Sequence, residues 1–110
     1  MSGSFDKRGK GFESKWAHDE ALRFKVYARR NKLLGVWAAG EMGVTGPSAD
    51  SYAKEVIASD FEKAGDDDVF AKVRKDLDAK GVALSDHLLR RKMEELLETA
   101  KAQIEQEAKK

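Results

Sequence analysis

Apolar residues recur at intervals of three and four along residues 16–42, which places them on one face of an α-helix. A first stripe consists of Leu22, Val26, Arg29, Leu33, Val36 or Trp37, and Gly40, and a second of Phe24, Ala28, Leu34 and Ala38. The pattern predicts one helix from about Trp16 to Met42, roughly 40 Å long at about 1.5 Å per residue. Gly43 is its expected C-terminal cap, because glycine readily adopts the left-handed conformation needed there.

Three further segments show the same helical periodicity. The first is predicted from about Pro47 to Lys63, and it carries Ala49, Tyr52, Ala53, Val56, Ile57 and Phe61 before a stop at Gly65. The next is predicted from a capping, acidic start at Asp66, Asp67 and Asp68 to Gly81, and it carries Val69, Phe70, Val73 and Leu77. The last follows Ser85, an expected N-cap, and carries Leu88, Leu89, Met93, Leu96, Leu97, Ala100 and Ile104. Its final turns, from Ile104 to Lys110, are polar and predicted to fray.

Four amphipathic helices with short connections and no competing strand pattern predict an all-α protein, a four-helix bundle-like domain spanning residues 16–110. The expected core consists of Leu22, Val26, Leu33, Trp37, Val56, Phe61, Val73, Leu77, Leu89, Met93 and Leu96. Residues 1–15 carry only Phe5 and Phe12 as aromatic side chains, too little apolar surface to offset the entropy of ordering them. They are therefore predicted to form a mobile N-terminal arm.

Composition and charge narrow the class of function. The 110 residues include no cysteine, which excludes disulfides and thiolate chemistry. No signal-peptide pattern and no membrane-spanning apolar run are found, so we expect a cytosolic protein without direct membrane insertion. Residues 1–35 hold nine Lys and Arg against four acids, and the rest holds twelve against sixteen. A basic first third favours an acidic partner surface or phosphates, whereas the overall pI near 7.9 argues against nucleic acid.

No group of residues indicates catalysis or metal binding. His18 and His87 each lack a second ligand at helical spacing, and Asp66–Asp68 lacks the alternating ligands of a calcium loop. Gly9-Lys10-Gly11 lacks the pattern of a phosphate-binding loop. We therefore expect a protein that is not an enzyme and holds no metal. A nucleotide would have only a shallow pocket between helices and Lys or Arg contacts, so its binding would be weak and salt-sensitive.

The arm and the basic cluster that follows it suggest a binding role. A short segment with spaced aromatics, joined to a stable helix, is typical of a peptide that docks in the groove of another protein. Phe12 and Trp16 are one turn apart, and they belong either to the core or to the apolar side of such a segment. The cluster of Arg29, Arg30 and Lys32 is interpreted as a solvated face with ion pairs. Together these features favour a regulator or binding module.

Several blocks of the sequence resemble a known family. FESKWAHDEALRFKVYARRNKLLGVWAA, then SYAKEVIASDFEKAGDDDVFAKVRKDLDAKG and SDHLLRRKMEEL, are similar in that order to the zeta subunit of alphaproteobacterial F1Fo-ATP synthase, an ATPase-inhibitor family. The resemblance covers about Phe5 to Leu97. The runs ARRNKLLGVWAA and DFEKAGDDDVFAKVR are its most specific parts.

The resemblance implies a four-helix fold with an N-terminal inhibitory arm. In that family the arm inserts at a catalytic α/β interface of F1 and stops rotation in the hydrolysis direction. The matching positions are Phe5, Asp6, Lys7, Arg8, Phe12, Glu13, Lys15, Trp16, Ala17 and His18. The implied partners are the α, β and γ subunits of F1, which would hold the protein at the inner membrane. The free protein is expected to be a monomer, and weak ATP or ADP binding at an unassigned site is implied.

One departure and two rival functions accompany this expectation. Gly9 and Gly11 lie in the arm, where each costs a helix roughly 1 kcal/mol relative to alanine. We therefore expect either weaker inhibition or a protein that mainly plays another role on the enzyme. The alternatives are a small helical domain that binds adenine nucleotides weakly as a sensor, and a general helix-mediated adaptor. Co-purification with F1 α, β and γ would favour the inhibitor.

Overall fold

The structure, a computed structural model, describes residues 16, 18–60 and 66–108, and these residues form helices and no strand. The four helices are α2 (Glu20–Glu41), α3 (Pro47–Ala58), α4 (Asp66–Ala79) and α5 (Asp86–Ala108). The predicted all-α, four-helix class is therefore confirmed. The predicted arm, together with Ala17, Phe61 and Gly65, lies outside the described residues.

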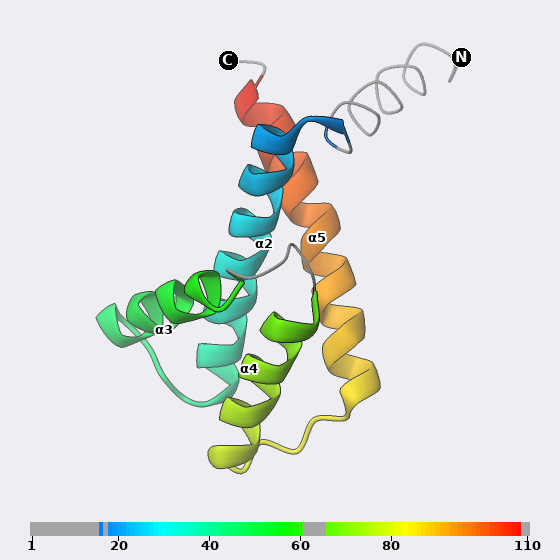
Figure 1. Cartoon of the computed structure of the whole chain (residues 1–110). Helices are drawn as coiled ribbons and strands as arrows, with labels where there is room; N and C mark the ends of the chain where they lie inside the picture. Colours follow the sequence, from blue (N-terminus) through cyan, green and yellow to red (C-terminus); the bar gives the residue numbers. More distant parts are fainter. Residues whose placement is uncertain (1–15, 17, 61–65, 109–110) are drawn as a thin grey trace, which may run out of the picture.

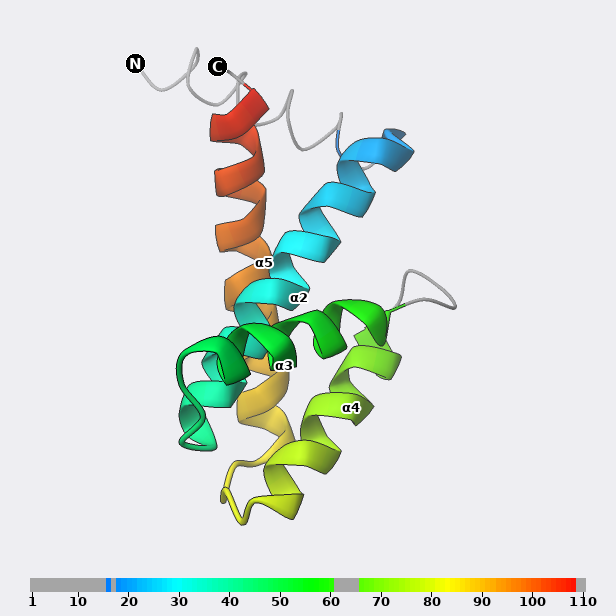
Figure 2. The same cartoon turned by 90° about the vertical axis from the view of Figure 1, so that its left-hand side faces the viewer.

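The two long helices, α2 and α5, form the axis of the molecule. Helices α3 and α4 pack beside the C-terminal half of α2 and the N-terminal half of α5 (Figures 1 and 2). The N-terminal half of α2 and the C-terminal half of α5 extend beyond them, so the start of α2 and the end of α5 lie at the same end of the molecule. The four helices thus enclose a core at one end and leave a two-helix stem at the other.

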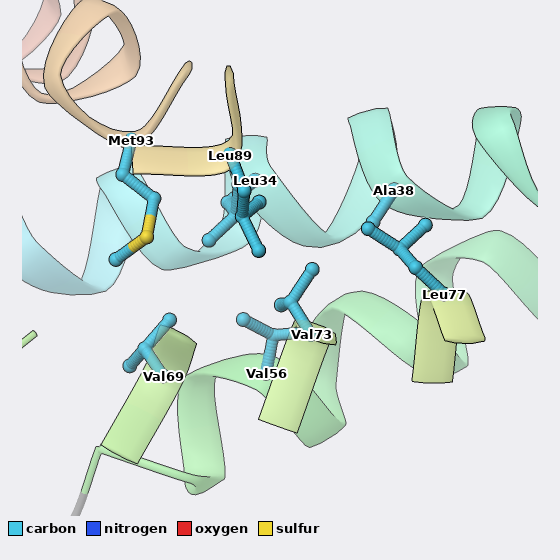
Figure 3. Packing of buried hydrophobic residues seen from close by; sticks show 8 residues of the cluster. All are labelled: Leu34, Ala38, Val56, Val69, Val73, Leu77, Leu89 and Met93. Atoms are coloured by element: carbon cyan, nitrogen blue, oxygen red, sulfur yellow. The ribbon is translucent and has the colours of Figure 1, made fainter. Parts of the chain in front are cut away.

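The main core draws residues from all four helices (Figure 3). Each of its members is at most 2% exposed: Leu34, Ala38, Val56, Val69, Val73, Leu77, Leu89 and Met93. Burying each larger apolar side chain stabilises a fold by about 1.5–3 kcal/mol. Among the predicted core residues, six are buried: Val26, Val56, Val73, Leu77, Leu89 and Met93. Leu22, Leu33, Trp37 and Leu96 are only partly buried.

A smaller second cluster holds the stem together. Val26 of α2 is buried with Ala100 and Ile104 of α5. Arg29 adds a salt bridge of 2.7 Å to Glu107 and a hydrogen bond of 2.8 Å to Gln103. The predicted fraying from Ile104 onward was therefore wrong up to Ala108, because α2 supplies partners for this part of α5.

Glycines end α2 and α4 as their positions predict. Gly43 and Gly81 have φ angles of 76° and 74°, and the amide of the following residue, Val44 or Val82, donates back to the carbonyl of Ala39 or Leu77. This pattern satisfies carbonyls that the helix itself leaves unpaired. The predicted N-cap of α5 is also confirmed, because the Ser85 hydroxyl accepts a 3.1 Å hydrogen bond from the Leu88 amide.

Two predicted boundaries were wrong. Helix α2 begins at Glu20 rather than Trp16, because the Asp19 carboxylate accepts a 3.1 Å hydrogen bond from the Leu22 amide and caps the helix there. Helix α3 ends at Ala58 rather than near Lys63. The Ser59 hydroxyl donates to the Val56 carbonyl at 2.6 Å and satisfies one carbonyl of the last turn. Neither hydrogen bond changes the periodicity of the apolar residues, so that periodicity could not predict the start of α2 or the end of α3.

The buried face of α2 also differs from the predicted stripes. Phe24 is 75% exposed and Val36 is 44% exposed, whereas Gly35 and Ala39 are buried. The prediction placed the large apolar residues of α2 on its buried face, but α3 packs against small residues such as Gly35. A Cβ atom added to Gly35 would lie 2.6 Å from the Cα of Ala53, so the α2 and α3 backbones approach each other closely at this point.

We expect Gly35→Ala to lower the free energy of unfolding by about 1–3 kcal/mol, because overpacking against Ala53 outweighs the gain in helix propensity. Gly40 lies in the same helix with no atom within 4 Å of a built Cβ. Gly40→Ala is therefore the matched control and should raise the free energy of unfolding by up to about 1 kcal/mol. Urea denaturation of both variants measures this, and equal effects would contradict the close contact.

Candidate functional site

The junction between the predicted arm and the helical body is built around Trp16. Its half-buried ring lies 5.9 Å from the Tyr27 ring, measured between centroids, and the Lys101 ammonium lies 5.0 Å from its centroid. Trp16 also packs against the stem cluster. Such aromatic and cation–π contacts contribute about 0.5–1.5 kcal/mol each. The body thus holds the chain at Trp16.

The chain changes direction immediately after this junction. Asp19 has extended backbone angles, with φ −102° and ψ 111°, between the helical residue His18 and the start of α2 at Glu20. The expected continuous helix from Trp16 is interrupted here. Because Trp16 is held on one side of this turn and α2 is capped on the other, the contacts of Trp16 and Asp19 fix the position of Trp16 relative to α2.

The structure places only two of the ten predicted arm residues. Trp16 is half-buried against the stem, and His18 is exposed. The other eight lie outside the described residues: Phe5, Asp6, Lys7, Arg8, Phe12, Glu13, Lys15 and Ala17. Their role as a partner-binding segment stays a prediction.

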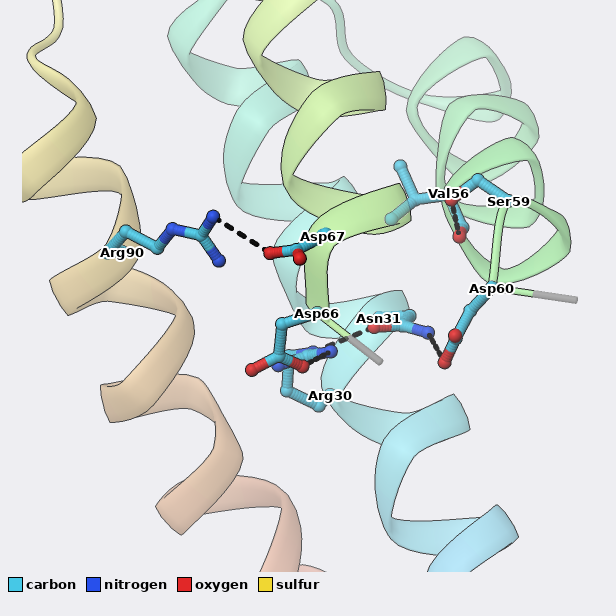
Figure 4. A network of polar contacts seen from close by, with 8 residues as sticks. All are labelled: Arg30, Asn31, Val56, Ser59, Asp60, Asp66, Asp67 and Arg90. Carbon is cyan, nitrogen blue, oxygen red and sulfur yellow. Dashed lines mark hydrogen bonds and ion pairs between the residues drawn. The ribbon is translucent and has the colours of Figure 1, made fainter. Parts of the chain in front are cut away.

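The predicted solvated basic cluster was wrong for its central residue. The Arg30 side chain is buried, with 0% of the residue exposed, and its guanidinium donates to Asn31 at 2.7 Å and to Asp66 at 2.9 Å (Figure 4). Its Cζ atom also lies 5.2 Å from the centre of the Tyr27 ring. A buried arginine needs such partners because its charge is costly to remove from water. Arg29 pairs with α5, and only Lys32 of the cluster is exposed.

The same polar network ties the ends of α3 and α4 to their neighbours (Figure 4). The Asn31 amide donates to Asp60 at 3.1 Å, just beyond α3. Arg90 of α5 pairs with Asp67 at 3.0 Å, and its guanidinium stacks over the Phe70 ring at 4.0 Å. The acidic start of α4 therefore faces two arginines as well as the positive end of its own helix dipole. These contacts are structural and leave Arg30 inaccessible to a partner.

A pocket of about 440 Å³ opens where the α2–α3 turn meets α3 and α4. It is lined by Met42, Val44, Pro47, Ser48, Ser51, Tyr52, Glu55, Asp76, Ala79 and Lys80. The volume is large enough for a small ligand. Its lining has two carboxylates and one ammonium group, however, a balance that disfavours the phosphates of a nucleotide. Weak binding of ATP or ADP stays a prediction.

The carboxylates of this pocket are already engaged. The Tyr52 hydroxyl donates to Asp76 at 2.8 Å, and Lys72 pairs with both Glu55 and Asp76 at 2.9 Å. Burial raises the pKa of the Tyr52 hydroxyl above its ordinary value, and the hydrogen bond to Asp76 raises it further. Burial lowers the pKa of Lys72, but its hydrogen bonds to the two carboxylates outweigh that effect, so its pKa is raised. The network links α3 to α4.

The described residues hold no group of three or more His, Cys, Asp or Glu that could bind a metal ion. His18 and His87 are both exposed and far apart in sequence. No helix within residues 16, 18–60 and 66–108 is long and apolar enough to span a bilayer.

A family model for "ATPase inhibitor subunit zeta" matches residues 1–103. The chain belongs to this family. The match includes the whole predicted arm and extends through all four helices into the last turns of α5. It confirms the resemblance drawn from the sequence blocks, supports an ATPase-inhibitory role, and implies binding to F1-ATPase.

A solved structure supports the same fold. The chain is similar to a protein whose structure was determined by solution NMR, with 46% sequence identity and a TM-score of 0.69. The similarity covers 78% of this chain and 98% of the other. No curated protein matches the chain. The family model therefore supports the family assignment, and the solved structure supports the fold.

The sequence-based predictions were wrong about the exposure of two side chains of α2 that bear on binding, Arg30 and Phe24. Arg30 lies four residues from both Val26 and Leu34, which are buried, so its position on the core face could have been inferred. Phe24 was assigned to an apolar stripe, and nothing in the local pattern distinguishes it from a buried residue. Its exposure follows from the position of α3, which covers only the C-terminal half of α2 (Figure 2).

We expect the free energy of unfolding to fall as the pH rises above about 10, where unfolded tyrosine ionises. A raised pKa in the folded state means that the fold keeps the Tyr52 proton while the unfolded chain loses it, so stability is present below pH 10 and lost above it. Lys72 acts in the same direction from about pH 10.5.

Tyr52→Phe should cost about 1 kcal/mol at neutral pH through the lost hydrogen bond, and should make the alkaline decline shallower. Urea midpoints measured from about pH 8 to pH 11 test this. Parallel declines for the variant and the unmodified protein would show that Tyr52 does not carry the effect.

Proposed function

We propose that this chain inhibits ATP hydrolysis by F1-ATPase by inserting its N-terminal arm at a catalytic α/β interface. The inserted arm blocks rotation in the hydrolysis direction, and the chain itself performs no chemistry. The observation that carries this proposal is the zeta-family match, which spans the arm and the helical body together.

The helical body acts as the anchor of the arm in this mechanism. Its buried core and the stem cluster give it a stable shape. Trp16, held by Tyr27 and Lys101, fixes the point from which the arm leaves. An inhibitor held at one defined point loses less entropy when its arm enters a groove than a free peptide does.

The arm supplies the inhibitory contacts. Residues 1–15 hold four Lys and Arg against two acids, which favours an acidic lining at the catalytic interface. We propose that Phe12 occupies an apolar hollow there, with Lys15 and Arg8 near acidic groups, as the arm becomes helical on binding. Gly9 and Gly11 then oppose this folding, since each costs a helix roughly 1 kcal/mol.

The proposed partners are the α, β and γ subunits of F1. The free chain is proposed to be a cytoplasmic monomer, held at the inner membrane only through the ATP synthase. Recovery of α, β and γ with the tagged chain from a cell extract would support this set of partners.

Deleting residues 1–15 should abolish inhibition while leaving the melting temperature nearly unchanged, because Trp16 and both core clusters remain. Hydrolysis by purified F1 with added protein measures the first effect, and circular dichroism measures the second. The full chain on the same F1 is the reference. If the truncated chain inhibited equally well, the helical body would have to carry the function.

Replacing Gly9 and Gly11 with alanine should strengthen inhibition, by about fivefold for each substitution if the arm is helical when bound. Titration of F1 activity gives the half-inhibitory concentration. Gly40→Ala, which replaces a glycine by alanine within helix α2 of the body, is the matched control and should leave the half-inhibitory concentration unchanged. An unchanged or weaker inhibition by the arm variant would contradict a helical bound arm.

A further inference from the structure

The face of α2 that α3 covers continues, uncovered, into the N-terminal half of the helix (Figure 2). There Ala21 is exposed, Ala28 is half-buried, and Phe24 is 75% exposed. These residues are three or four apart and lie on one side of the helix. Lys25 and Lys32 are exposed beside them. We call these five residues the α2 strip.

Ion pairs engage half of the Lys and Arg side chains in the described part of the chain, and the two lysines of the strip belong to the other half. Neither Lys25 nor Lys32 pairs with a carboxylate of the described residues. Seven other basic side chains do pair with one: Arg29, Arg30, Lys72, Arg74, Arg90, Lys92 and Lys101. Exposed cations without partners beside an exposed phenylalanine combine charge with apolar area, as protein-binding surfaces do.

Charge decides among the occupants available to this strip. The chain's own residues 1–15 carry an excess of positive charge, so docking them on Lys25 and Lys32 would be repulsive. A second copy meeting the strip through a twofold axis would bring the same lysines together. An acidic surface with an apolar hollow would attract the two lysines and accommodate Phe24, without the charge repulsion of the other two occupants.

The position of the strip identifies where such a surface would come from. Trp16 is held on the body, and Phe24 lies in the second turn of α2, about 6 Å along the axis from its start at about 1.5 Å per residue. A protein that holds the end of the arm is therefore adjacent to the strip.

We propose that the α2 strip is a second binding site for the ATPase, which takes an acidic helical surface of the enzyme with an apolar hollow for Phe24. This inference rests on the proposed function and divides it between two parts of the chain. The arm blocks the catalytic interface, while the strip adds affinity and speeds association. Changes in the strip therefore shift the concentration needed for inhibition and leave the maximal inhibition unchanged.

Two variants of the full chain test the strip. Phe24→Ala should raise the half-inhibitory concentration about tenfold, as truncation of an interface anchor does. Lys25→Glu combined with Lys32→Glu should slow association with immobilised F1 about tenfold and reverse or flatten its dependence on salt. Both variants should keep the melting temperature, because the three side chains are exposed.

Matched controls separate the strip from general effects. Leu88→Ala removes another exposed apolar side chain, 51% exposed on α5. Lys54→Glu combined with Lys75→Glu makes the same change in net charge at exposed lysines of α3 and α4. Each control should leave the association rate and the half-inhibitory concentration within about twofold of the unmodified chain.

The outcomes distinguish this inference from the proposed function. If the unmodified chain inhibits F1 and the strip variants behave as it does, the strip inference is wrong and the arm mechanism stands. If the strip variants bind more weakly but deletion of residues 1–15 leaves inhibition intact, the arm mechanism is wrong and the strip stands. If the chain neither binds nor inhibits F1, both are wrong.

Two further results would replace the proposed occupant. A dimer seen by light scattering and lost in Phe24→Ala would assign the strip to a second copy of the chain. Binding to vesicles of anionic lipid that Lys25→Glu with Lys32→Glu abolishes, without any change in F1 binding, would assign it to a membrane surface. Either result would overturn the ATPase site on α2.

Discussion

The close approach of α2 and α3 at Gly35 governs how the other parts of the molecule are arranged. Because a Cβ at Gly35 would meet the Cα of Ala53 at 2.6 Å, the two backbones can lie together only where α2 offers small residues. Those residues, Gly35, Ala38 and Ala39, lie in the C-terminal half of α2. Helix α3 packs against that half, and the four-helix core forms beside it.

This arrangement divides the molecule into two parts. The core at one end is closed by four helices, whereas the stem is closed only by α2 and α5 (Figure 1). The stem leaves room for Trp16 to rest on Tyr27 and leaves Phe24 exposed. The surfaces that we connect with ATPase binding thus lie on the part of the molecule that α3 does not reach.

Electrostatics reinforces the division. Arg30 donates a hydrogen bond to Asn31 and forms an ion pair with Asp66 inside the fold. Arg29 forms an ion pair with α5, and Arg90 forms one with Asp67. These pairs join α2 to α4 and α5, and α4 to α5. On the stem, Lys25 and Lys32 remain exposed next to Phe24.

Local sequence patterns are sufficient to predict the helices, much of the core, and the family. Periodic apolar residues such as Val73, Leu77, Leu89 and Met93 need no tertiary information to be placed inside, and the glycines after α2 and α4 mark the ends through their backbone freedom alone. The sequence blocks also identified the zeta family, and with it the candidate arm.

Which part of α2 is covered depends on packing between helices that are distant in the sequence. Phe24 and Leu34 belong to one apolar stripe of the sequence, yet one is exposed and the other buried, because α3 packs against a single half of the helix. Arg30 is buried because Asp66, 36 residues later, returns to meet it. Such outcomes depend on contacts between distant segments, and local periodicity carries no information about them.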